Sequence, residues 1–499
     1  MRNSWGTTLF AAAVLSMVLG TAGFSEAVEK QPGSFWYAVD NISDVEEDAR
    51  ILVWVTLPPE WHGQSVQVSN ITPEPIAILE DPVSGNRIIE WLVEPPARQA
   101  DPGTSPTYHF FHYDFELEQK PLHFEIDPAA IGPFDKSTPL YRQYTMTETW
   151  IQTGGKVLDL ARDIVGQERN PWLQGGLIYD WLVKNLTFVP GGTESRDAIS
   201  TLTGLTGDCG QFSVMFTALC RSIGIPARTV TSTWVDGGGH VFAELNLPGY
   251  GWVPVDVSLG QMLLPDGGGM TQEEVEGFMK NRGVPLGDPR WFFGNLADGR
   301  IITAVGNNIR FESPTLGRTV TFQRMQPGGV DATPEAFVNE GVNSSVIQGG
   351  FFVFGQEVSD EETAHTFVHQ RLASSFFKVG LYDVVEDSCR KSLAKRQDSI
   401  QAWMNIGKVH MHKGDYYKAE AAFKRAINGV ALKRNEKMDA LIWTHNYLGN
   451  CYDLLGHRDM AVVEYQTVVD LNNNYLGAVD YARKYLERSF DQSPESQNK

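Results

Sequence analysis

The stretch that decides the fold lies at residues 207–228 and reads GDCGQFSVMFTALCRSIGIPAR. Apolar residues recur at helical spacing over 212–223, and Gly224 and Pro226 stop the pattern, so a helix is predicted there. Asp208 stands where it would cap the first turn of this helix. Cys209 therefore falls near the positive end of the helix dipole, which lowers a thiol pKa from about 8.5 and favours a reactive thiolate.

The segments that follow bring a histidine and an aspartate into register. Residues 240–246 and 252–257 have the composition of strands, and LPGY at 247–250 is a turn sequence. A hairpin centred near Pro248 pairs positions whose numbers add up to 496, which sets His240 opposite Asp256. Facing residues have Cβ atoms about 4.5–5.5 Å apart, close enough for a carboxylate to fix the imidazole tautomer. A slip of one residue would place the two on opposite faces.

Each of these residues alone has an ordinary structural explanation. A cysteine at the start of a helix is commonly just a small buried residue. A histidine in a strand is commonly a polar side chain with its hydrogen bonds satisfied, and an aspartate after a strand commonly caps a turn or helix. The predicted hairpin favours the three acting together. A metal site is the weaker alternative, because no second His or Cys lies within ligand spacing. No metal or other cofactor is expected.

At these residues a family can be identified. The run 208–228, the pair Gly239-His240 and the segment 252–256 (WVPVD) resemble the transglutaminase-like superfamily of papain-type folds. The resemblance covers residues 155–260 closely, and residues 294–327 resemble an extension of many bacterial members. It implies Cys209 as nucleophile, His240 as general base and acid, and Asp256 as the orienting residue. For the oxyanion hole only the Cys209 backbone N–H can be assigned.

The N-terminal third contains two further units. Arg2, an apolar stretch at 9–19 and small residues up to Ala27 have the layout of a secretory signal, too short to span a bilayer. Short Val-, Ile- and aromatic-rich runs punctuated by turn residues then predict a small antiparallel β-sandwich. The mature protein is expected to be exported, periplasmic in a Gram-negative cell and secreted otherwise, with no membrane span.

The C-terminal region repeats with a period of 34 residues. Gly380, Gly414 and Gly456 begin aligned motifs, with an eight-residue insertion before the third copy. Trp403 and Phe423 are among the residues that match tetratricopeptide spacing, which predicts a helical array. In such an array the first helix of each repeat lines a concave groove. The predicted groove residues are Phe367, Gln370, Ser374, Phe377, Gln401, Met404, Lys408, Met411, Trp443, Asn446, Asn450 and Asp453.

These patterns together predict a multidomain chain: an N-terminal β-sandwich, an α+β papain-like transglutaminase core and a C-terminal α-helical tetratricopeptide solenoid. The expected bounds are a signal peptide over 1–27, the β-sandwich over 28–145, the transglutaminase-like catalytic domain with its extension over 146–325, a Gly- and Pro-rich linker over 326–362, the repeats over 363–490 and a tail over 491–499.

Composition excludes some function classes. The 499 residues carry 41 Lys+Arg against 61 Asp+Glu, a formal charge of -20, which argues against a nucleic-acid partner. Four widely separated cysteines are too few for a disulfide framework in an exported chain of this length. The protein must therefore be held together by packed cores.

Two functions from different classes fit these patterns. The first is an exported cysteine amidase, peptidase or transglutaminase that acts on a protein or peptide through a thioester, with hydrolysis and transamidation left open. In it the groove, through Phe367, Phe377, Met404, Met411 and Trp443, recruits a protein partner by an apolar or uncharged segment. The alternative is a non-catalytic envelope scaffold that uses the papain-like and repeat domains for protein binding.

Overall fold

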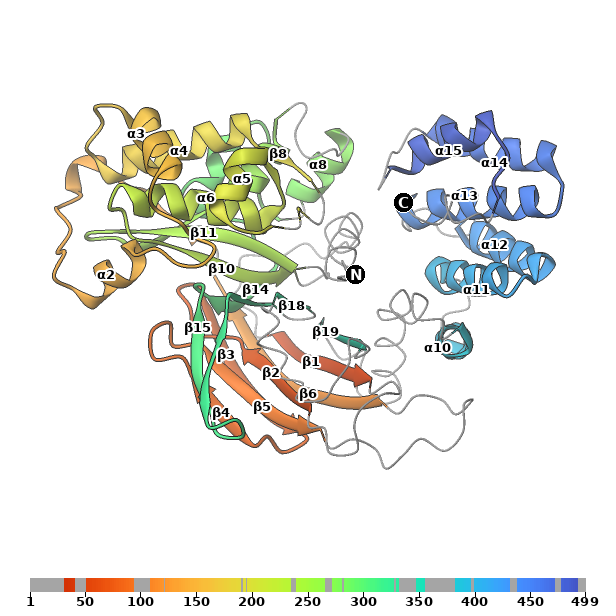
Figure 1. The fold of residues 1–499 in the computed structure, drawn as a ribbon, viewed down its shortest axis with the longest axis horizontal. Coiled ribbons are helices and arrows are strands. Elements are labelled where there is room, and N and C mark those ends of the chain that lie inside the picture. Colours follow the sequence, from red (N-terminus) through yellow and green to blue (C-terminus); the bar gives the residue numbers. More distant parts are fainter. Residues whose placement is uncertain are drawn as a thin grey trace.

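The computed structural model describes most of the chain in three parts, a strand-rich region, a mixed core and a helical array (Figure 1). The described residues are 31–40, 51–93, 108–120, 122–189, 192–193, 195–234, 239–264, 272–280, 282–326, 329–331, 347–354, 382–395, 399–430, 438–471 and 477–491. The expected signal peptide lies outside them. None of the described helices combines the length and the hydropathy needed to cross a bilayer.

Two antiparallel sheets form the strand-rich region. One has the order β19-β1-β6-β3, made by Ile347–Phe354, Gln31–Asp40, Tyr108–Gln119 and Gln64–Thr72. The other has the order β2-β5-β4, made by Ile51–Leu57, Arg87–Val93 and Ala77–Glu80. Alternating apolar residues give each sheet a buried face. The core shared by the two sheets contains Phe35, Val53, Val55, Leu57, Val66, Ile89, Trp91, Phe111, Tyr113, Phe115 and Leu117.

The expected linker over 326–362 needs correction. Strand β19 pairs antiparallel along β1, from Gly33 opposite Phe354 to Asp40 opposite Ile347. The hairpin β17–β18, Arg324–Gln326 and Gly329–Asp331, also enters this range. The glycine-rich composition suggested a linker, but the apolar run 351–354 has the composition of a strand. A segment late in the sequence therefore completes the N-terminal sheet.

The expected domain boundary at residue 145 also differs from the structure. Helix α2 (Pro139–Thr145) belongs to the mixed core, where the ring of Tyr144 packs edge-on against Trp252. Conversely, the hairpin of β15 (Ile309–Ser313) and β16 (Arg318–Phe322), expected in the catalytic extension, packs on Trp54 of the strand-rich region. Buried aromatic side chains rather than sequence order decide these attachments.

The mixed core is built on a four-stranded antiparallel sheet of order β12-β11-β10-β14: Gly251–Val255, Gly239–Leu247, Ala227–Trp234 and Arg300–Val305. Helices α3 (Lys156–Val165), α4 (Pro171–Asn185), α5 (Ala198–Gly204) and α6 (Cys209–Ser222) lie on one side of it (Figure 1). Helix α6 is buried along almost its whole length, including its polar residues Gln211, Ser213, Thr217 and Arg221. Two shorter helices, α7 (Val257–Met262) and α8 (Gln272–Lys280), follow β12.

Strand β14 joins the core to the strand-rich region. The Gln64 side chain both donates to the Ile302 carbonyl at 3.0 Å and accepts from its N–H at 2.7 Å. Asn86 makes the same pair of bonds with Val305, at 2.7 and 2.9 Å. The side chain of Gln119 donates to the Arg300 carbonyl. Three amides from the strand-rich region therefore fix β14, whose other edge pairs with β10.

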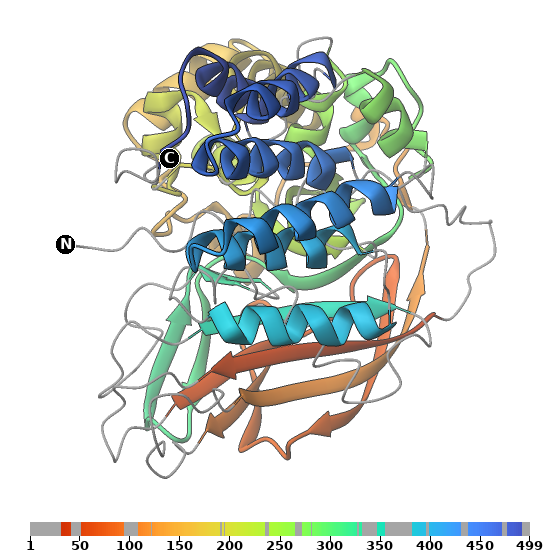
Figure 2. The same ribbon diagram turned by 90° about the vertical axis from the view of Figure 1, so that its right-hand side faces the viewer.

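The helical array follows the predicted repeat. Helices α10 to α15 are Tyr382–Lys395, Ile400–His412, Tyr416–Val430, Met438–Leu454, Arg458–Leu471 and Ala478–Glu487, and each packs against the next along the array (Figure 2). Gly407 and Gly449 allow close approach within a repeat, because a Cβ at Gly407 would lie 2.3 Å from the Phe423 ring and one at Gly449 2.6 Å from the Tyr465 ring. The two glycines are one period plus the eight-residue insertion apart.

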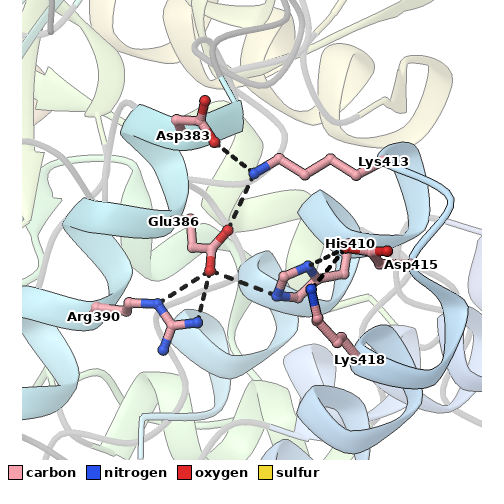
Figure 3. Close-up of polar contacts among 7 residues, drawn as sticks. All are labelled: Asp383, Glu386, Arg390, His410, Lys413, Asp415 and Lys418. Carbon is pink, nitrogen blue, oxygen red and sulfur yellow. Dashed lines mark hydrogen bonds and ion pairs between the residues drawn. The ribbon is translucent and has the colours of Figure 1, made fainter.

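An ion-pair cluster joins α10 to α11 (Figure 3). Lys413 lies 2.6 Å from Asp383 and 3.2 Å from Glu386, which also pairs with Arg390. Because Asp383 and Arg390 are mostly exposed, the cluster contributes little stability for each pair. The cluster nevertheless links α10, the first described helix of the array, to α11.

The predicted groove needs correction as well. Met404 and Met411 are buried in the core of the array, 7% and 6% exposed, so they offer little apolar surface. Asn446 donates to the Ala478 carbonyl and Asn450 to the Tyr481 hydroxyl, so both serve to hold the capping helix α15. Trp443 remains half-buried. Phe367, Gln370, Ser374 and Phe377 lie outside the described residues.

Candidate functional site

Cys209 is the first residue of α6, and Asp208 caps that helix. The Asp208 carboxylate accepts from the Gly210 and Gln211 N–H groups at 3.0 and 3.2 Å, and Gln211 completes a capping box. Asp208 is 1% exposed, so its charge beside Cys209 would disfavour a thiolate. Arg196 forms an ion pair with Asp208 and offsets that charge.

A serine hydroxyl joins the start of α6 to the central strand. Ser213, one turn after Cys209, lies 2.7 Å from the Cys209 carbonyl and 3.1 Å from the Val241 carbonyl, with its hydroxyl as donor. Val241 is in β11, directly after His240. This link fixes the helix start against the part of the sheet that carries His240.

His240 and Asp256 are in hydrogen-bond contact. His240 Nε2 lies 2.7 Å from Asp256 Oδ2, and the two residues are 4% and 0% exposed. The observed hairpin register pairs Ala243 with Val255 and Leu247 with Gly251, so paired positions add up to 498 rather than 496. The predicted register is wrong by two residues. A register shift of two residues leaves His240 and Asp256 on the same face of the sheet. Their side chains therefore meet diagonally instead of directly across the hairpin.

The Asp256 carboxylate is held on both oxygens. Oδ1 accepts from the Leu259 N–H at 3.2 Å and from the Ser258 hydroxyl at 3.1 Å, while Oδ2 faces His240 and, at 3.5 Å, Arg300 Nη1. Burial alone would raise the Asp256 pKa, but His240 and Arg300 outweigh it, so this pKa is lowered. The carboxylate is therefore ionised at neutral pH and keeps a proton on His240 Nε2.

Cys209 and His240 line one small cavity of about 10 Å³, room for roughly one water molecule. Its walls are mostly apolar: Phe188, Trp234, Leu259, Met262 and Phe278, with Ser258 as a further lining residue. Trp234 packs against His240 with ring centroids 5.4 Å apart, and Phe278 of α8 packs edge-on against Trp234 at 5.5 Å. Cys209 itself is 2% exposed, so the site is nearly closed. The sequence-predicted trio thus converges on one buried place.

The other three cysteines lie in different surroundings. Burial raises the pKa of the Cys389 thiol and of the Cys451 thiol to about 12, and raises that of Cys220 further. All four cysteines are free thiols. Within the described residues no group of three His, Cys, Asp or Glu side chains is arranged to hold a metal ion.

Sequence reasoning missed three residues of the site: Arg300, Ser258 and Trp234. Arg300 lies 44 positions after Asp256 in the chain and reaches it only because β14 pairs with β10. The one available signal was a cation at the head of the apolar run 301–305. Trp234 and Ser258 carried no signal apart from their nearness to His240 and Asp256.

Comparisons with known proteins agree with this arrangement. Residues 158–257 match the transglutaminase-like superfamily, and residues 398–474 match the tetratricopeptide repeat. The chain thus contains a transglutaminase-like core followed by tetratricopeptide repeats, as the sequence predicted. An uncharacterized protein of Haemophilus influenzae is 29% identical over 167 residues, which is 26% of this chain and 45% of that protein. The chain therefore spans less than half the length of this curated relative.

Two solved structures show weaker likeness. A putative cysteine protease from Cytophaga hutchinsonii is 15% identical, with 66% of this chain and 92% of that chain covered and a TM-score of 0.37. The periplasmic domain of TgpA from Pseudomonas aeruginosa is 13% identical, with 52% and 99% covered and a TM-score of 0.25. Likenesses this distant say nothing about substrate or reaction.

Proposed function

We propose that the protein is an exported cysteine enzyme that transfers or hydrolyses the acyl group of a peptide or amide through a thioester on Cys209. One observation carries this proposal: His240 turns Nε2 to Asp256 at 2.7 Å and lines the same cavity as Cys209. With Nε2 engaged, Nδ1 is the ring nitrogen available for proton exchange with the thiol.

The chemistry follows from these positions. The Cys209 thiolate attacks the carbonyl carbon, and the His240 imidazolium gives its proton to the leaving amine. Water or a second amine then attacks the thioester, His240 takes up the proton of that nucleophile, and the Cys209 thiolate is released. Asp256 remains ionised throughout and keeps the imidazole oriented. We assign the Cys209 N–H, at the first position of α6, as a donor to the developing oxyanion.

Hydrolysis and transamidation share the same acyl-enzyme. They differ only in whether water or an amine reaches the thioester. Because the side chains around Cys209 and His240 are mostly apolar, an uncharged acyl group is favoured over a charged one. The tetratricopeptide array supplies a surface for a protein partner, which positions substrates near the core.

The test uses the full-length protein and a glutamine-containing protein substrate such as casein. Amine incorporation is followed with a fluorescent primary amine, and hydrolysis by release of ammonia or of new amino termini. Wild type is expected to give one of these products and Cys209→Ala none. Cys389→Ala, which removes a buried thiol of the array, is the matched control and is expected to behave as wild type. Equal product from Cys209→Ala and wild type would refute the assignment of Cys209.

The scaffold alternative has one observation in its favour, the 2% exposure of Cys209. A scaffold requires no unusual thiol. A small haloacetamide distinguishes the two functions, because an enzyme site labels rapidly at neutral pH whereas a buried structural cysteine labels only as the protein unfolds. Slow labelling of Cys209 at the global unfolding rate would favour the scaffold.

A further inference from the structure

A second cation shares the carboxylate that orients His240. Arg300 Nη1 lies 3.5 Å from Asp256 Oδ2, the same oxygen that accepts from His240 Nε2. Arg300 is 2% exposed, and its guanidinium lies 4.3 Å from the Trp234 ring centroid and 5.2 Å from that of Phe242. Trp234 in turn packs on His240. The Arg300 guanidinium therefore contacts two residues, Asp256 and Trp234, that each contact His240.

Arg300 is held by a carbonyl that precedes β14 and by the strand-rich region. Its Nε donates to the Ala297 carbonyl at 3.2 Å, and its backbone carbonyl accepts from Gln119 of the strand-rich region. Burial lowers the pKa of Arg300 to about 10, with Asp256 acting in the opposite direction, so the side chain is still a cation at neutral pH. A buried charge costs stability unless it is paired, and the Arg300 Nη2 group has no hydrogen-bond partner among the described residues. Because the buried Arg300 charge lowers stability, we looked for a functional role of this side chain.

We propose that Arg300 is a positioning residue of the Cys209 site whose charge sets the pH range in which the Cys209 thiolate and the His240 imidazolium coexist. The proposal rests on the proposed function. Asp256 alone would stabilise the imidazolium and move both the thiol and the imidazolium titrations to higher pH. The adjacent positive charge offsets Asp256 and moves both to lower pH. Because β14 is clamped by Gln64 and Asn86, the strand-rich region contributes to this adjustment.

Other charged and titratable groups surround the site. Arg282, which follows α8, lies 4.6 Å from the Trp234 ring, and Asp298 precedes β14. Tyr179 of α4 donates to the Pro289 carbonyl, and burial together with Asp256 raises its pKa, so it stays neutral. The Arg196–Asp208 pair lies on the Cys209 side. Among the charged groups of the described residues, Arg300 and His240 lie within 3.5 Å of the Asp256 carboxylate, which is why substitution of Arg300 is the informative change.

The experiment measures the rate of Cys209 alkylation by iodoacetate from pH 4 to 10 in the full-length protein. A bell-shaped profile is expected, with an acidic limb for thiolate formation and an alkaline limb for loss of the imidazolium charge, which attracts the anionic reagent. Arg300→Met is expected to move both limbs to higher pH by about half a unit to one unit. Asp256→Asn, which removes the opposite charge, is expected to move them to lower pH. Arg300→Lys, which keeps the charge, is expected to restore the wild-type limbs.

Arg310→Met is the matched control, because Arg310 lies exposed on β15, the next strand in the chain. It is expected to leave the profile unchanged. If Arg300→Met does not fold, the comparison of Arg300→Gln with Arg300→Lys carries the same prediction. Limbs that stay in place in the neutral Arg300 variants, or move to lower pH, overturn the inference even if wild-type Cys209 is reactive. A wild-type Cys209 without any bell-shaped reactivity overturns the proposed function itself.

Discussion

Gly260 offers the sharpest structural perturbation near the site. It lies in α7, the helix capped by Asp256, and a Cβ built on it would be 1.8 Å from Tyr179 Oη, 2.8 Å from Tyr179 Cζ and 3.0 Å from the Pro289 carbonyl. Real Cβ contacts do not fall below 3.0 Å, so Gly260→Ala requires a displacement of about 1.2 Å. Tyr179 is 1% exposed and cannot swing into solvent. Much of the displacement must therefore fall on α7 and on Asp256.

The expected loss of stability has two parts. Overpacking costs about 1–3 kcal/mol. Loss of the buried Tyr179 hydrogen bond to Pro289 costs a further 1–3 kcal/mol, roughly. A shift of about 1 Å in an orienting group lowers the rate of Cys209 acylation by about 100-fold.

The assay combines thermal unfolding followed by circular dichroism with the Cys209 alkylation rate at pH 7. Gly277→Ala on α8 is the control, because a Cβ there would contact nothing within 4 Å; it is expected to be neutral or slightly stabilising. In Gly260→Ala combined with Tyr179→Phe the closest contact is absent, so part of the lost reactivity should return. Wild-type stability and reactivity in Gly260→Ala would refute the packing described around α7.

Three further predictions concern the triad, the domain contact and the array. Asp256→Asn is expected to keep the fold and lower the acylation rate about 10³- to 10⁴-fold in the casein assay, because the amide favours the wrong imidazole tautomer; unchanged turnover would exclude an orienting role. The Glu244 carboxylate is 0% exposed, lies 2.6 Å from Arg228 and accepts a hydrogen bond from Trp61. Burial alone would raise the pKa of Glu244, but Arg228 and His62 outweigh burial, so this pKa is lowered. The ionised carboxylate therefore stabilises the fold above a pH of about 4.3, and this stabilisation is lost on further acidification. The difference in unfolding midpoint between wild type and Glu244→Gln should thus persist from pH 7 to 5 and shrink progressively below a pH of about 4.3, and a difference that grows on acidification would contradict the ion pair. A chain ending after Phe354, which keeps β19, is expected to retain Cys209 reactivity and lose a protein partner; loss of reactivity in the folded truncated chain would make the array an integral part of the site.

The sequence was most informative where local signals decide structure. The cap at Asp208 and the apolar period after it predict α6, and the alternation around the turn at 247–250 places His240 and Asp256 on one face although the register differs by two residues. The period of 34 residues likewise predicts the repeats. These features depend on neighbours within a few turns or one hairpin, so short-range physics suffices.

Long-range pairing was not predictable in the same way. Strand β19 joins β1 across more than 300 positions, and Arg300 reaches Asp256 only through the sheet. No local period signals such partners, and a glycine-rich stretch has a linker composition whether or not it forms an edge strand. The groove residues failed for another reason, since Met404 and Asn446 have the spacing of groove positions but are used for packing and for holding α15.

The most direct measurement of the central claim is residue-resolved alkylation. Folded protein at pH 7 is treated with iodoacetamide, and the labelling rate of each of the four cysteines is followed by mass spectrometry of peptides. Because burial raises the thiol pKa of Cys220, Cys389 and Cys451, and only Cys209 shares a cavity with an imidazole oriented by a carboxylate, Cys209 is expected to react at least about 100-fold faster than the other three. The excess should disappear in His240→Ala. Equal rates for all four thiols, or a fast Cys209 that is indifferent to His240→Ala, would contradict a thiolate–imidazolium site.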